Sequence, residues 1–97
     1  MEKEVIKQFK ALANENRLAI YKYLREHEQV SVDPEEEGSN VGDIAQQFDL
    51  ALSTVSHHLR ILHESGLIVC ERRGQHTYCV INHQAVDGLR TFFSSEE

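Results

Sequence analysis

Apolar side chains recur at helical spacing in five segments of this chain. In the first segment the apolar stripe contains Val5, Ile6 and Phe9, and lysines occupy the other faces. Such a stripe is typical of an amphipathic helix that packs against a core. The segments predicted to be helices are residues 3–12, 15–27, 41–48, 52–64 and 83–94.

Residues that favour helix ends stand at several of these boundaries. Asn14 or Asn16 can cap the second helix, and Asn40 can cap the third. Gly66 is suited to the left-handed backbone that ends the fourth helix. Between residues 33 and 40, one proline, one glycine and four acidic residues interrupt the pattern. This segment is therefore predicted to be an exposed acidic loop.

Two runs of β-forming residues, 67–71 and 76–81, flank a turn that contains Gly74. Such runs around a glycine predict a two-stranded β-hairpin. The chain has 97 residues, which leaves no room for a second hydrophobic core. The predicted fold is therefore α+β, mainly α, with five helices and one hairpin in a single domain spanning residues 1–97.

The order helix, tight turn, helix, hairpin over residues 41–81 is that of a winged helix-turn-helix. In this motif the second helix enters the DNA major groove, and the hairpin is called the wing. With a buried stripe at Val55, Leu59 and Leu62, a rotation of about 100° per residue turns His58 toward the domain. The residues predicted to face DNA are Ser53, Thr54, Ser56, His57 and Arg60. An ordinary solvated helix face is the alternative interpretation.

The hairpin adds polar side chains beside that helix. A ribbon with cations near its turn can contact phosphates or a minor groove. The wing residues predicted to contact DNA are Arg72, Arg73, Gln75 and His76. A polar helix face and a cationic ribbon together favour DNA binding over a solvated surface.

The net charge of −6 at first argues against a nucleic-acid partner, because phosphate binding relies on Lys and Arg. The acidic residues are concentrated, however, with eight of them and no Lys or Arg in residues 26–49. Residues 50–86 contain two acidic residues, three arginines and five of the six histidines. With no apolar run near the ~20 residues that span a bilayer and no secretory pattern, we expect a cytoplasmic protein.

Several segments resemble one family of regulators. Residues 9–18, Phe-Lys-Ala-Leu-Ala-Asn-Glu-Asn-Arg-Leu, are similar to the N-terminal signature of ArsR/SmtB-type regulators. Residues 53–62 resemble the recognition helix of that family, and residues 72–74 with Tyr78 resemble its wing. The resemblance covers nearly the whole chain. It implies a dimeric, operator-binding repressor whose first and last helices form the dimer interface.

The apolar stripes of the first and last helices agree with this implication, because they exceed what so small a core needs. The alternative is that both helices cap the core of a monomer. A dimer would place two recognition helices roughly 34 Å apart, one DNA turn, which matches a palindromic operator in double-stranded DNA. The residues predicted at the dimer interface are Val5, Ile6, Phe9, Val86, Leu89, Phe92 and Phe93.

The chain departs from the family at the start of the recognition helix, where Ala51 and Leu52 replace a capping Ser and a polar residue. It also lacks the family's metal ligands. The helix at residues 41–48 has no Cys, and His83 with Ala85 stands where an Asp-x-His pair is found. One ligand does not make a zinc site. We therefore expect no metal and no cofactor, and the effector stays open.

The two cysteines have two interpretations. If Gly74 and Gln75 form a two-residue loop, Cys70 lies opposite Cys79 with Cβ atoms about 4.5–5.5 Å apart, close enough to suggest a redox pair in the wing. Reduced thiols that act as small apolar residues in a cytosolic sheet are the favoured alternative.

Other function classes fit the sequence less well. We expect no enzymatic activity, because the chain has no Gly-rich phosphate loop and no recognisable catalytic constellation. A winged helix used for protein–protein contact would suit the acidic half of the chain. A metal- or redox-responsive repressor with an unrecognised site is a further alternative.

Overall fold

The computed structural model describes residues 2–28 and 38–94, which form five helices and a three-stranded antiparallel sheet. The predicted helices and the two predicted strands are confirmed to within one or two residues at their ends. The helices are α1 (Glu2–Leu12), α2 (Glu15–Glu26), α3 (Val41–Phe48), α4 (Leu52–Glu64) and α5 (His83–Phe93). The strands are β1 (Ser39–Asn40), β2 (Ile68–Arg73) and β3 (His76–Ile81).

The prediction of a loop up to residue 40 is wrong at its end. Ser39 pairs with Cys79 and Asn40 with Tyr78, so β1 adds a third strand in the order β1-β3-β2. A two-residue strand is too short to show the alternation that identifies strands in a sequence. Its pairing partner, β3, lies far along the chain. The rest of the predicted acidic loop, residues 33–37, lies outside the described residues.

Asparagine side chains cap three of the helices, as local sequence favours. The Asn14 side-chain oxygen accepts a hydrogen bond from the Arg17 amide at 3.1 Å, which settles the choice between Asn14 and Asn16. Asn40 caps α3 in the same way, at 2.7 Å from the Gly42 amide. The start of α4 has no side-chain cap, because Ala51 occupies that position. Helix α4 therefore relies on packing for its stability.

The hydrophobic core lies where α2, α3 and α4 meet the base of the sheet. The apolar stripe predicted for α4 is confirmed, since Val55, Leu59 and Leu62 are all buried. Helix α4 is thereby held against the rest of the domain along most of its length. The buried apolar residues of the core are Ala11, Ile20, Leu24, Ile44, Ala45, Val55, Leu59, Leu62, Leu67, Ile68, Cys79 and Ile81.

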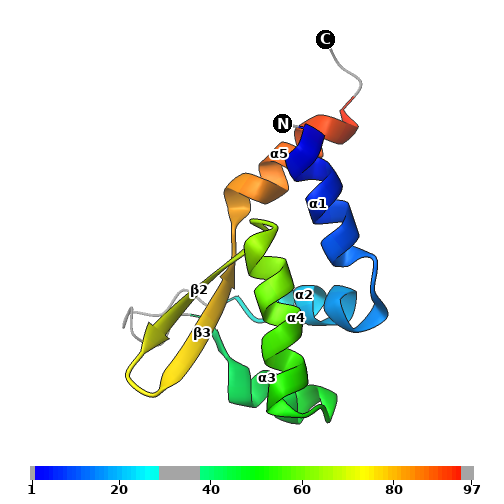
Figure 1. Ribbon diagram of the computed structural model, residues 1–97. Coiled ribbons are helices and arrows are strands. Elements are labelled where there is room, and N and C mark those ends of the chain that lie inside the picture. Colours follow the sequence, from blue (N-terminus) through cyan, green and yellow to red (C-terminus); the bar gives the residue numbers. More distant parts are fainter. Residues whose placement is uncertain (1, 29–37, 95–97) are drawn as a thin grey trace.

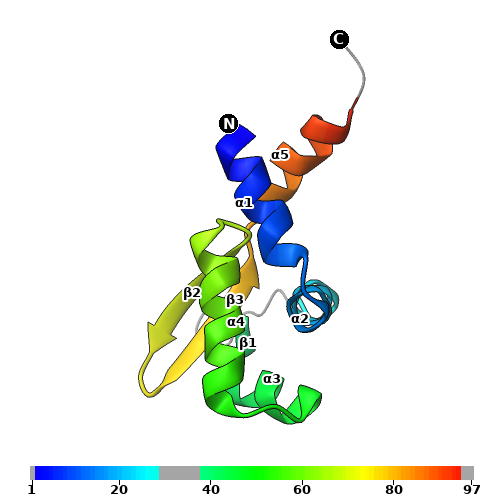
Figure 2. The same ribbon diagram turned by 45° about the vertical axis from the view of Figure 1, so that its right-hand side comes forward.

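The elements divide between two ends of the molecule. Helices α1 and α5 lie together at one end, beside both termini, whereas α3 and the turn of the β2–β3 hairpin lie toward the other (Figures 1 and 2). Helix α4 runs between these ends. Helix α3 and the hairpin turn are thus separated from the surface formed by α1 and α5.

Candidate nucleic-acid interface

Helices α3 and α4 are joined by a tight turn at residues 49–51. Asp49 has a left-handed backbone with φ of 53°, a conformation that Asp adopts more readily than most residues. The Leu50 amide donates to the Ala45 carbonyl at 3.0 Å, which closes the end of α3. The turn therefore fixes the angle between α3 and α4.

The outward face of α4 carries hydrogen-bonding side chains. Ser53, Ser56, His57 and Arg60 are exposed, and Thr54 is half-buried. Arg60 Nη2 lies 3.4 Å from His57 Nδ1, so the two side chains are neighbours one turn apart. Hydroxyl, imidazole and guanidinium groups can all reach base edges or phosphates. The face has the chemistry expected of a recognition helix.

His58 points the other way, as the helix geometry predicts, and is buried at 7% exposure. Its Nδ1 lies 3.4 Å from Arg17 Nη1, and Arg17 Nε donates to the Ala11 carbonyl at 2.6 Å. Burial lowers the pKa of the His58 imidazole below its ordinary value, and the positive charges of Arg17 and His57 lower it further. His58 is thus held neutral beside a cation that joins α1, α2 and α4.

This lowered pKa predicts that the protein loses stability as the solution becomes acidic. The unfolded chain takes up a proton on His58 near pH 6.5, whereas the folded chain does so only at lower pH. The stability that the neutral His58 contributes to the folded state is complete above about pH 6.5. It is lost as the pH falls toward the pKa of His58 in the folded chain. We expect urea unfolding to show a smaller loss between pH 7.5 and pH 5.5 for His58→Gln, whose amide oxygen can still accept from Arg17. Equal losses in both proteins would contradict the assignment.

The hairpin has a two-residue turn at Gly74 and Gln75, and Gly74 has a φ of +65°. Both arginines therefore lie in β2 rather than in the turn, where successive side chains point to opposite faces. Arg72 is exposed, whereas Arg73 is half-buried, with its guanidinium 4.5 Å from the Tyr78 ring centroid. Of the predicted wing residues, Arg72, Gln75 and His76 are exposed, and Arg73 packs within the wing.

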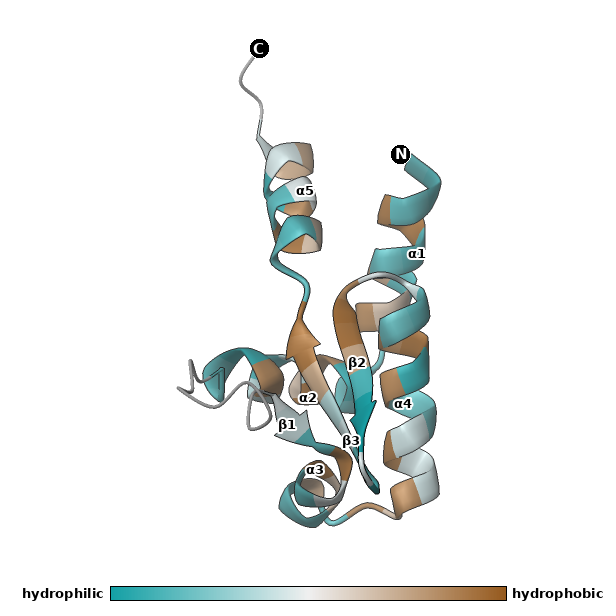
Figure 3. Ribbon diagram, turned by 90° about the vertical axis from the view of Figure 1, so that its left-hand side faces the viewer, coloured by the Kyte–Doolittle hydropathy of each residue, from teal (hydrophilic) through white to brown (hydrophobic). Residues whose placement is uncertain are grey.

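Helices α1 and α5 expose an aromatic cluster at the opposite end. The ring centroids of Phe9 and Phe92 lie 5.8 Å apart, and those of Phe9 and Phe93 lie 5.7 Å apart. Phe92 is 51% and Phe93 70% exposed, and no residue of α5 is buried. The apolar residues of α1 and α5 face each other across this end (Figure 3). Of the other predicted interface residues, Ile6 is exposed, and Val5, Val86 and Leu89 are half-buried.

Comparison with known proteins places this architecture in a family. A helix-turn-helix domain family matches residues 12–71. The HTH-type transcriptional regulator YbzH of Bacillus subtilis is 37% identical to the chain, over 96% of this chain and 98% of its own length. The arsenical resistance operon repressor of the same species is 33% identical over 84% of this chain and 69% of its own length. The chain belongs to the ArsR-type winged helix-turn-helix family of transcriptional regulators.

A solved structure supports the same assignment. The homodimeric winged helix-turn-helix DNA-binding domain from Mycobacterium bovis is 30% identical and has a TM-score of 0.70. The similarity covers 93% of this chain and 74% of that one. The predicted family and fold are confirmed. A module for protein–protein contact is not favoured, because the relatives of this regulator are transcriptional regulators.

Within residues 2–28 and 38–94, no three His, Cys, Asp or Glu side chains are grouped so as to hold a metal ion. His83, which the sequence resemblance placed at a metal position, has its Nε2 2.6 Å from Glu28 Oε1. Over the same residues, no helix is both long and apolar enough to cross a membrane.

Sequence reasoning missed two features of this region. Arg17 lies in the N-terminal signature, but its contact with His58 joins residues 41 positions apart, which no local pattern reports. His63 and Thr77 line a cavity next to the two cysteines, and only the packing of α4 on the sheet brings them together. Helical spacing could have placed His63 near Arg60, but not near β3.

Proposed function

We propose that this regulator is a homodimeric repressor that acts in the cytoplasm by binding a palindromic operator in double-stranded DNA. The observation that carries the proposal is the polar outward face of α4, presented next to an exposed cation of the wing. Half or more of protein–DNA hydrogen bonds go to the sugar–phosphate backbone, and the rest specify bases. The residues proposed to contact DNA are Ser53, Thr54, Ser56, His57 and Arg60 of α4, with Arg72, Arg73, Gln75 and His76 of the wing.

The aromatic cluster of α1 and α5 supports the homodimer. Exposed aromatic side chains that gather on one surface are typical of protein–protein interfaces. The similar domain from Mycobacterium bovis is itself homodimeric. The proposed interface lies away from α3 and the hairpin, so pairing through it leaves both recognition helices accessible to DNA.

Repression, rather than activation, is supported by the named relatives. Two of them are repressors, the arsenical resistance operon repressor and SdpR of Bacillus subtilis, the latter 42% identical over 41 residues. A repressor needs only to occupy its operator. The described residues form a winged helix with two flanking helices, which is sufficient for that role.

The test is fluorescence anisotropy with duplex DNA from upstream of the protein's own gene, beside a scrambled duplex, at two salt concentrations. We expect binding about 10³-fold or more tighter than to scrambled DNA. Arg60→Ala should weaken specific binding by about tenfold or more, because a contact of Arg to a base or phosphate is lost.

The matched control is Arg25→Ala, which removes the same charge from an exposed position on α2 and should leave affinity within about twofold. If the native protein bound both duplexes equally weakly, and this binding disappeared at moderate salt, the proposal of a specific operator would be contradicted. If Arg25→Ala lowered operator affinity as much as Arg60→Ala does, the loss would be due to the change in overall charge.

A further inference from the structure

The two cysteines of the wing are joined by a disulfide between Cys70 of β2 and Cys79 of β3. The expectation of reduced thiols is therefore wrong for this structure. The hairpin register places the two residues directly opposite each other, with Cα atoms 4.2 Å apart. So short a separation is typical of a non-hydrogen-bonded antiparallel pair, where side chains lie closest.

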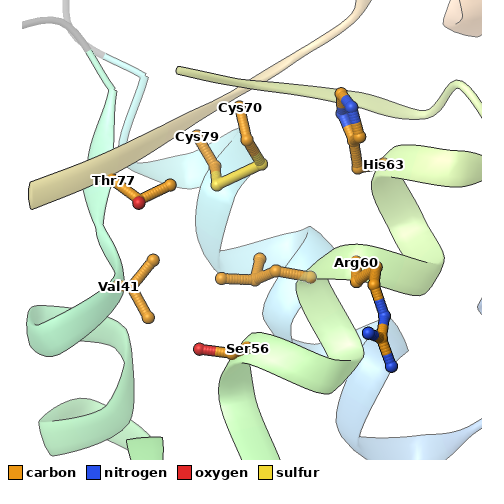
Figure 4. A pocket seen from close by; sticks show the side chains of 8 residues that line it. Val41, Ser56, Arg60, His63, Cys70, Thr77 and Cys79 are labelled. Carbon is orange, nitrogen blue, oxygen red and sulfur yellow. A yellow bond between two sulfur atoms is a disulfide. The ribbon is translucent and has the colours of Figure 1, made fainter. Parts of the chain in front are cut away.

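A cavity of about 260 Å³ lies beside this disulfide, between α4, the start of α3 and the hairpin (Figure 4). Its walls include both cysteines, Leu59, Thr77, Arg60 and His63. The volume corresponds to several water molecules at about 30 Å³ each, enough for a small organic group. A solute in the cavity would therefore meet the disulfide and the recognition helix together.

The two sulfurs differ in their surroundings. Cys79 belongs to the buried core and is 1% exposed, whereas Cys70 is only half-buried. Attack on a disulfide needs access to the sulfur that is attacked. Cys70 is therefore the more accessible of the two cysteines to an incoming nucleophile.

We propose that Cys70 is a site of reversible modification by a small thiol that enters this cavity. The thiolate sulfur bonds to Cys70 Sγ, the bond between Cys70 and Cys79 breaks, and its electron pair leaves with Cys79 as a thiolate. The products are a mixed disulfide on Cys70 and a free Cys79, with no net oxidation or reduction. Attack by the Cys79 thiolate on the mixed disulfide reverses the step and expels the small thiolate.

A second molecule of thiol carries the reaction further. Its thiolate attacks the small-molecule sulfur of the mixed disulfide, so that a disulfide of two small thiols forms and Cys70 leaves as a thiolate. The two small thiols are then oxidised by two electrons, and the protein disulfide is reduced by two. Each step is ordinary thiol–disulfide exchange.

The modification would alter DNA binding, and this consequence rests on the proposed function. Ser56 and Arg60 belong to the proposed DNA-binding face, and both also line the cavity. A group attached to Cys70 fills the space between α4 and the wing, which changes how the two can contact one duplex. We expect the modified protein to bind its operator about tenfold or more weakly, as for the loss of one good contact.

The site of attack is tested with the intact protein. The disulfide form is treated with a limited excess of L-cysteine, quenched with acid, alkylated and mapped by mass spectrometry. We expect cysteinyl adducts on Cys70 and alkylation on Cys79. Adducts on Cys79, equal adducts on both residues, or no adduct under conditions in which dithiothreitol reduces the disulfide would overturn the proposal.

Two matched variants test the same assignment without relying on the capture of the mixed disulfide by acid and alkylation. Cys79→Ser leaves only Cys70, and Cys70→Ser leaves only Cys79, and both are treated with cystine. We expect Cys70 in the first variant to be cysteinylated at least tenfold faster than Cys79 in the second. Similar rates would overturn the assigned difference between the two sulfurs.

The effect on DNA is measured with Cys79→Ser before and after cysteinylation, so that both samples carry the same substitution. Tenfold weaker operator binding after modification is the expected result, and unchanged affinity would remove the regulatory part of the inference. If the unmodified native protein does not prefer its operator over scrambled DNA, the proposed function fails, while mapping of the adduct still decides the modification site.

Discussion

Phe92→Asp is expected to convert the dimer to a monomer and to lower operator affinity by about 10²-fold or more. Phe92 is 51% exposed in a single chain and lies beside Phe9 of α1. A carboxylate buried there without a partner would oppose dimerisation. Once the chains separate, the second half-site no longer binds at the high effective concentration that a dimer provides.

Sedimentation or light scattering gives the mass, expected to be twice the 11.2 kDa chain for the native protein and one chain for the variant. Leu18→Asp is the matched control, because Leu18 is similarly exposed at 53% but lies on α2, outside the proposed interface. It should stay dimeric. A native protein that is monomeric at micromolar concentration, or a Phe92→Asp variant that remains a dimer, would show that α1 and α5 do not form the interface.

Leu62→Ala is expected to lower the free energy of unfolding by about 2–5 kcal/mol. Leu62 is fully buried and belongs to the core on the inward face of α4. Truncation removes its apolar contacts and leaves a cavity that the surrounding side chains fill only in part. Since domains are stable by about 5–15 kcal/mol, this loss is a large share of the total.

Urea or thermal unfolding monitored by circular dichroism measures the change. Leu52→Ala is the matched control, since it makes the same substitution on the same helix at a residue that is 59% exposed. Its effect should stay within about 0.5 kcal/mol. Comparable destabilisation by both variants would mean that the loss comes from the helix itself rather than from the core.

Much of this fold could be read from local patterns. The spacing of Val55, Leu59 and Leu62 identified the buried side of α4, because one helix turn brings such residues to one face. The same spacing placed His58 inward, and Asn40 marked the start of α3. These features depend on interactions within a few residues, which is why a single sequence reports them.

The candidate site could be predicted from the sequence only in part. The outward polar face of α4 follows from helical geometry, but the different surroundings of Arg72 and Arg73 follow from the exact length of the hairpin turn. A turn of two residues places both arginines in β2, where the pleat sends their side chains to opposite faces. One residue more or less in the turn would have changed this arrangement and the opposition of Cys70 and Cys79.

Local patterns in the amino-acid sequence are enough to define the five helices, the hairpin, the family resemblance and the residues available to contact DNA. The pairing of Ser39 and Asn40 with β3, the contact between Arg17 and His58, and the cavity beside the disulfide emerge only from the folded chain. Each of these unites segments far apart in the chain, and their meeting depends on how the whole core packs. Periodicity and capping act over one or two helix turns and cannot encode such distant contacts.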